Sequence, residues 1–99
     1  MRLNSVDRTR ILAAATEQFG LDVAVLLFGS RVDDTKRGGD IDLLVCRAIA
    51  ETKELLAKKI RFLATLEKTL GERKIDVVIE LPDDVRPIVR VAHETGVRL

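Results

Sequence analysis

The sequence contains few of the residues that mark aromatic, disulfide-bonded or membrane proteins. Tryptophan and tyrosine are absent, phenylalanine occurs three times, and the single cysteine is Cys46. One cysteine excludes an internal disulfide and a zinc site built from cysteines, and it fits the reducing cytoplasm, where we expect the protein to reside. Neither a long apolar run nor a basic segment followed by an apolar one is present, so we expect no membrane span and no signal peptide.

A strong net charge is also missing, because 17 basic and 16 acidic residues leave a formal charge of +1. No global field therefore attracts nucleic acid, and the shortage of aromatic side chains removes the usual stacking platforms for bases. We do not expect nucleic-acid polymerisation. With no repeat and no linker, residues 1–99 are expected to form one domain. Its limited core favours stabilisation by a partner or a second copy of the chain.

Short apolar runs alternate with segments of helical periodicity along the chain. The runs at residues 23–28, 41–45 and 75–79 are each bounded by glycine or polar residues, which is typical of buried strands. Helices are predicted from Asn4 or Ser5 to about Gln18, over 52–70 and over 85–95. This order predicts an α/β or α+β fold in which helices pack on a small mixed sheet.

The predicted helices carry apolar residues at helical spacing. In the first helix Ile11, Leu12, Ala15 and Phe19 follow the spacing of one helical face, and in the last helix Ile88, Val89 and Ala92 are apolar. In the helix over 52–70 we expect an apolar face of Leu56, Ile60, Leu63 and Leu70, opposite a solvated face of Glu54, Lys58, Arg61, Thr65 and Lys68.

Three acidic residues lie at the starts of two predicted strands. Asp40 and Asp42 are two residues apart, so their side chains project from one face about 7 Å apart, and Ile41 points into the core. Asp76 is the second residue of the run 75–79. Carboxylates this close raise the pKa of at least one of them, or a cation neutralises both, and such hard oxygen ligands suit Mg²⁺. If the two strands are neighbours, the three acids converge into a site typical of two-metal phosphoryl transfer.

The segment before these acids carries residues suited to phosphate binding. Gly29 allows a close approach of the backbone to a ligand, and the Ser30 hydroxyl with free N–H groups can hold phosphate oxygens. Arg31, Lys36 and Arg37 form a local basic cluster, within which the residues alone do not identify the phosphate contact. Nearby, Asp33 and Asp34 are interpreted as turn residues.

The stretch FGSR…GGDIDLLV, followed by KIDVVI, resembles the minimal nucleotidyltransferases of the DNA polymerase β superfamily. Their signature is Gly-Ser, a spacer, Asp-x-Asp and a later acid on a neighbouring strand. Gly29, Ser30, Asp40, Asp42 and Asp76 match it position by position. The order of elements is similar too, so the resemblance covers nearly the whole chain. The spacer differs, because residues 32–39 replace the Gly-Asp-Ala-Arg-Pro type of loop found in commoner members.

This resemblance implies a nucleotidyltransferase fold like the polymerase β palm, with two Mg²⁺ ions and ATP as the substrate. Asp40, Asp42 and Asp76 would be the metal ligands and catalytic residues, and Asp76 would also assist deprotonation of the acceptor hydroxyl. Gly29 and Ser30, with Arg31 as a further candidate, would bind the nucleotide phosphates. The reaction would transfer AMP and release pyrophosphate.

Small members of this family are similar to the antitoxin partners of helical HEPN ribonuclease toxins, some of which adenylylate a tyrosine of the toxin. We therefore expect a protein partner of this type, which would also supply the acceptor surface. Two alternatives remain. The protein could be a nucleotide-binding or toxin-sequestering module without strong catalysis, or a small-molecule nucleotidyltransferase with a separate acceptor-binding subunit.

Two residues with reactive side chains lie outside this motif. His93 has no acidic or cysteine companion near it in the sequence, so it is interpreted as a surface residue of a helix. Cys46 is interpreted as a packing residue at the end of its strand.

Overall fold

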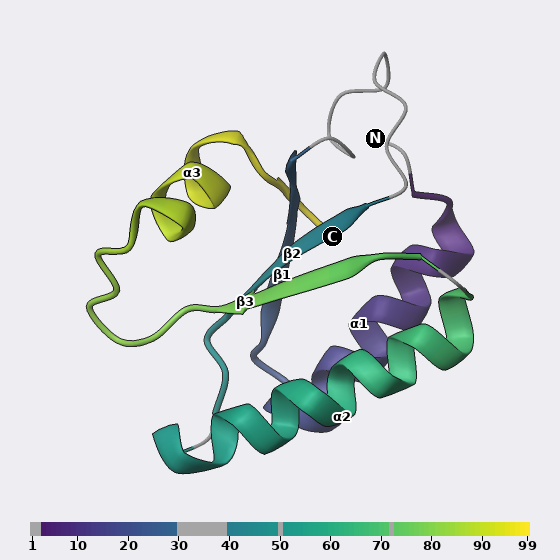
Figure 1. Cartoon of the computed structure of the whole chain (residues 1–99), viewed down its shortest axis with the longest axis horizontal. Helices are drawn as coiled ribbons and strands as arrows, with labels where there is room; N and C mark the ends of the chain where they lie inside the picture. Colours follow the sequence, from purple (N-terminus) through teal and green to yellow (C-terminus); the bar gives the residue numbers. More distant parts are fainter. Residues whose placement is uncertain (1–2, 30–39, 50, 72) are drawn as a thin grey trace.

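A computed structural model describes residues 3–29, 40–49, 51–71 and 73–99 as a mixed four-stranded sheet with helices on both faces (Figure 1). The elements are α1 (Ser5–Phe19), β1 (Ala24–Phe28), β2 (Ile41–Cys46), α2 (Thr52–Leu70), β3 (Ile75–Ile79), α3 (Pro87–Thr95) and β4 (Val97–Arg98). This is the fold class that the sequence predicts, and it is consistent with a nucleotidyltransferase fold.

The strands lie in the order β3-β2-β1-β4. β1 is antiparallel to both β2 and β4, whereas β2 and β3 run parallel. In the register, Phe28 of β1 pairs with Asp42 of β2, and Asp42 pairs with Asp76 of β3. The end of β1 and the starts of β2 and β3 therefore meet at the same end of the sheet.

One face of the sheet packs on α1 and α2, and we call it the α1–α2 face (Figure 1). It is formed by alternate side chains of β1, β2 and β3, namely Val25, Leu27, Ile41, Leu43, Val45, Val77 and Ile79. Phe19 of α1 and Phe62 of α2 meet edge to face above it, with 5.5 Å between ring centroids. Because Ile11, Leu66 and most of these strand residues are fully buried, this face contains the larger core of the described residues.

The opposite face of the sheet, which we call the α3 face, packs on α3. Its apolar side chains come from the three longer strands and from α3: Ala24, Leu26, Phe28, Leu44, Cys46, Val78, Val89 and Ala92. Asp42, Asp76 and Glu80 share this face by strand alternation. The predicted burial on both faces is therefore confirmed for β1 and β2, with polar positions left at the two ends of the α3 face. It is wrong for β3, because this strand lies at the edge of the sheet, where Asp76 is exposed and Val78 only half-buried.

Individual residues explain where α1 and α3 begin. Asn4 caps α1, because its side-chain oxygen accepts a hydrogen bond from the Asp7 N–H at 2.8 Å. α3 begins at Pro87, two residues later than predicted, since a residue before proline avoids the helical region and proline itself suits the first turn. β4 was not predicted, because two residues are too few to show a strand pattern.

The buried stripe of α2 differs from the predicted one. Leu56 and Ile60 are 67% and 58% exposed, whereas Phe62, Leu66 and Leu70 are buried. Apolar residues occupy more than one side of this helix, so packing of Phe62 against Phe19 decides which stripe faces the core. None of the helices in the described part of the chain combines the length and apolarity that a bilayer crossing needs.

Candidate active site

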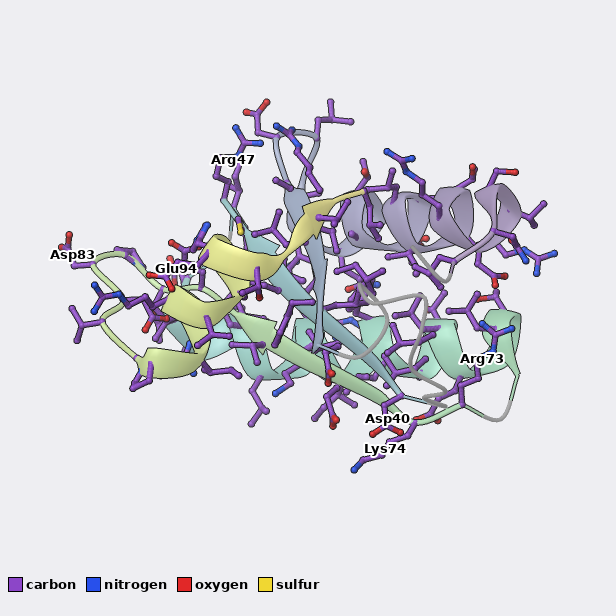
Figure 2. All side chains as sticks on the ribbon, turned by 90° about the horizontal axis from the view of Figure 1, so that it is seen from above. Asp40, Arg47, Arg73, Lys74, Asp83 and Glu94 are labelled. Atoms are coloured by element: carbon purple, nitrogen blue, oxygen red, sulfur yellow. The ribbon has the colours of Figure 1, made fainter. Side chains whose placement is uncertain are left out.

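The three predicted acids gather at one end of the α3 face. Asp42 and Asp76 are paired directly on adjacent parallel strands, and Asp40 immediately precedes β2, two residues from Asp42. Because side chains alternate along a strand, Asp42 and Asp76 project from the same face of the sheet. Figure 2 shows Asp40 beside Lys74 at the end of the sheet away from α3. The structure therefore brings together acids that are 34 residues apart in the sequence.

The electrostatics of Asp42 reflect this clustering. Asp40 and Asp42 are half-buried, and Asp76 is exposed. Burial raises the pKa of Asp42 above its ordinary value, and the negative charges of Asp76 and Asp40 raise it further. A hydrogen bond with Asp76 acts in the same direction, while the positive charge of Lys74 opposes the rise. Ionising all three acids at once therefore costs free energy, which a bound cation would offset.

The backbone turn after β1 is built around Asp42. Gly29 follows Phe28 with a φ of +77°, a region that side chains other than glycine rarely adopt. A Cβ atom added to Gly29 would collide with the Asp42 carboxylate oxygen Oδ2. Only glycine therefore allows the chain to pass this close to Asp42. The predicted approach of Gly29 to a phosphate ligand stays a prediction.

An ion pair that the sequence does not reveal supports the segment before β3. Asp7, in the first turn of α1, is only 7% exposed, and the Arg73 guanidinium donates to its Oδ2 at 3.1 Å. The Ile41 N–H donates to the Lys74 carbonyl at 2.9 Å, which ties the start of β2 to the same segment. The hydrogen bond holds the beginnings of β2 and β3 together, and the ion pair fixes the segment before β3 to α1. Asp7 and Arg73 are 66 residues apart, so no local pattern could have paired them.

Part of the predicted site lies outside the described residues. This holds for Ser30 and Arg31, for the basic candidates Lys36 and Arg37, and for the turn residues Asp33 and Asp34. The assignment of phosphate contacts to this segment therefore stays a prediction. Among the described residues, Lys74 is a cationic group beside the acids that the sequence reasoning did not single out.

A second polar cluster occupies the opposite end of the α3 face. The Cys46 thiol donates a hydrogen bond to Glu80, and Glu80 Oε1 lies 2.6 Å from His93 Nε2. Burial and the Glu80 contact raise the pKa of Cys46 to about 12. His93 is indeed a surface residue of α3, but the fold supplies the acidic and cysteine companions that its sequence neighbourhood lacks.

Carboxylate oxygens gathered beside a close-packed backbone turn are typical of domains that bind Mg²⁺ together with substrate phosphates. Comparison with known families identifies residues 9–98 as a nucleotidyltransferase domain, a match that includes all three acids and Gly29. The chain therefore belongs to the nucleotidyltransferase domain family, and nucleotidyl transfer is its general function. No curated protein matches the chain.

Proposed function

We propose that this protein transfers AMP from ATP to a hydroxyl group of a protein partner in a Mg²⁺-dependent reaction. The observation that carries the proposal is the direct pairing of Asp42 with Asp76 on adjacent strands, with Asp40 beside them. Family membership supplies the reaction class, and the donor chemistry of these acids supports the metal.

The donor set fits Mg²⁺. Asp40, Asp42 and Asp76 offer only carboxylate oxygens, the ligand type that Mg²⁺ prefers. Burial, followed by the negative charges of Asp76 and Asp40, raises the pKa of Asp42, and a divalent cation would neutralise the repulsion among the three acids. When bound, Mg²⁺ would supply charge neutralisation and polarisation of the phosphate groups.

The protein's own residues have distinct roles in the proposed reaction. Asp76 is the most exposed of the three acids, so it can accept the proton of the acceptor hydroxyl. The hydroxyl oxygen attacks the α-phosphorus of ATP, its new P–O bond forms, and the bond to the leaving pyrophosphate breaks. The Gly29 turn brings the backbone close to Asp42, and the nucleotide phosphates would bind beside this turn. Positioning and charge neutralisation supply most of the rate.

An exposed apolar stripe on and just before α3, the helix that packs on the same face of the sheet as the acids, supports a protein as the acceptor. Val85 is 92% exposed, and Ile88 and Val91, each three residues further along, are 42% and 46% exposed. This spacing places Ile88 and Val91 next to each other on the outer side of α3. We propose that a helical partner of the HEPN ribonuclease type covers this stripe and presents its hydroxyl to the acids, with the protein acting as a cytoplasmic antitoxin.

The test is transfer of label from ATP labelled at the α-phosphate. The protein and the partner that co-purifies with it are incubated with Mg²⁺ and the labelled ATP, and label retained on the partner is measured. We expect labelling by the wild-type protein and a loss on the order of 100- to 1,000-fold with Asp42→Asn, because a charged ligand at the reacting phosphate is removed.

Asp83→Asn is the matched control. Asp83 is exposed and has a φ of 55°, which asparagine tolerates, and Figure 2 shows it at the opposite end of the molecule from Asp40. We expect this variant to label the partner normally. A partner that is inhibited without being labelled would contradict the proposal and favour a toxin-sequestering module. Label found only on a small molecule would contradict it too and favour a small-molecule nucleotidyltransferase with a separate acceptor-binding subunit.

A further inference from the structure

We propose that Cys46, Glu80 and His93 form a binding site for Zn²⁺ at the end of the α3 face opposite the three acids. Cys46 is the last residue of β2, Glu80 directly follows β3, and His93 lies on α3. The site therefore joins two strands and the helix that packs on them. It is independent of the proposed transfer reaction.

The ligand atoms are already close to one another. The Cys46 sulfur, a Glu80 carboxylate oxygen and a His93 ring nitrogen all lie within 4.8 Å of one another. Typical bond lengths of about 2.0–2.3 Å to Zn²⁺ place neighbouring ligand atoms about 3.3–3.8 Å apart in a tetrahedral site. The 2.6 Å contact between Glu80 and His93 would have to open slightly, and both side chains are exposed enough to move.

The donor types favour Zn²⁺ over Mg²⁺. A thiolate and an imidazole are ligands for borderline-soft ions, whereas the three acids offer oxygen alone. Cys46 is four residues after Asp42 on β2, and Glu80 is four residues after Asp76 on the strand beside it. Four strand residues span about 13 Å, so the two clusters cannot share an ion.

The charges around the cluster are compatible with a bound divalent ion. Arg47 and Arg98 line the same pocket of about 300 Å³ as Cys46, Glu80 and His93. A Cys46 thiolate and the Glu80 carboxylate would cancel the two positive charges of Zn²⁺, so the arginines would face a neutral site. Three protein ligands leave a fourth position, which water would occupy on the pocket side.

Binding of Co²⁺, a spectroscopic substitute for Zn²⁺, provides the test. The chain has one cysteine and one histidine, so a thiolate-to-cobalt charge-transfer band can come only from Cys46. We expect this band together with the visible bands of a tetrahedral site, and their loss when Zn²⁺ is added. An excess of Mg²⁺ should leave them unchanged. Absence of the charge-transfer band in the wild-type protein would overturn the proposal.

Variants assign the remaining ligands. His93 is exposed, so His93→Gln should fold normally and weaken Zn²⁺ binding at least about 100-fold in competition with a chromophoric chelator, more than the loss of a group outside the ligand shell usually costs. Cys46 is buried, so circular dichroism would accompany Cys46→Ser, which should abolish the band. Asp42→Asn is the control and should leave Zn²⁺ affinity unchanged. Unchanged affinity in His93→Gln, or a loss in Asp42→Asn, would contradict the assignment.

Discussion

The two faces of the sheet differ in how apolar residues are distributed over them. On the α1–α2 face the strand residues are apolar along the length of the sheet and are covered by two helices. On the α3 face the apolar residues occupy the middle, while carboxylates lie at one end and the Cys46–Glu80–His93 cluster lies at the other. The first face can supply most of the hydrophobic stabilisation, which leaves the second free to carry polar groups that cost stability.

The largest effect on stability should come from the α1–α2 face. Leu66→Ala removes a fully buried side chain, and we expect a loss of about 2–5 kcal/mol in the free energy of unfolding, measured by urea denaturation. Ile60→Ala on the same helix is the matched control, because Ile60 is largely exposed and its loss should cost about 0.5 kcal/mol or less. Equal costs for the two variants would contradict the observed orientation of α2.

Gly29→Ala tests whether the close approach of the Gly29 turn to Asp42 is needed for stability, for nucleotidyl transfer or for both. The positive φ and the collision with Asp42 should cost about 1–3 kcal/mol in unfolding free energy. Displacement of the Asp42 carboxylate should also lower nucleotidyl transfer by about 100-fold at temperatures where the variant remains folded. Full activity in a folded variant would show that the close approach of this turn is not needed for the reaction.

The smallest expected effect is an increase in the free energy of unfolding when Asp42 is replaced by asparagine. The pKa of Asp42 is higher in the folded chain than its ordinary value of 3.8, so between these two values the folded state binds more protons than the unfolded state. Stability of the metal-free protein therefore falls as pH rises through this window and stays lower at neutral pH. Asp42→Asn removes this cost.

Because water screens a half-buried group, we expect Asp42→Asn to stabilise the metal-free protein at pH 7 by about 1 kcal/mol or less, seen as an increase of a few degrees in Tm. The difference should shrink as the pH falls toward 3.8 and disappear well below it, where Asp42 is protonated in both states. Asp83→Asn serves as the control and should show no such gain. A variant less stable than the wild type at neutral pH would refute the view that these acids repel one another.

Sequence reasoning was most accurate where the signal was local. The limits of α2 and β3 follow from periodicity and from the glycine and polar residues around them. The acids could be recognised as candidates because an acid two residues from another, next to apolar strand residues, is unusual without a ligand. Their convergence depended on strand order, which only the sheet shows. The sequence alone could not predict which side of α2 packs on the sheet, because several sides of this helix carry apolar residues.

Other contacts carried no sequence signal at all. Asp7 meets Arg73, and Cys46 meets Glu80 and His93, only because strand pairing and helix packing bring together residues far apart in the chain. Each of these side chains has many solvated alternatives, so its type alone predicts no partner. Periodicity, caps and the Gly-Ser…Asp-x-Asp pattern were enough to predict the three helices, the three longer strands and the reaction class. Packing decided which side of α2 is buried, which charged residues are neighbours and where the Cys46–Glu80–His93 cluster forms. These features depend on the sum of many weak contacts across the whole sheet, which no local pattern records.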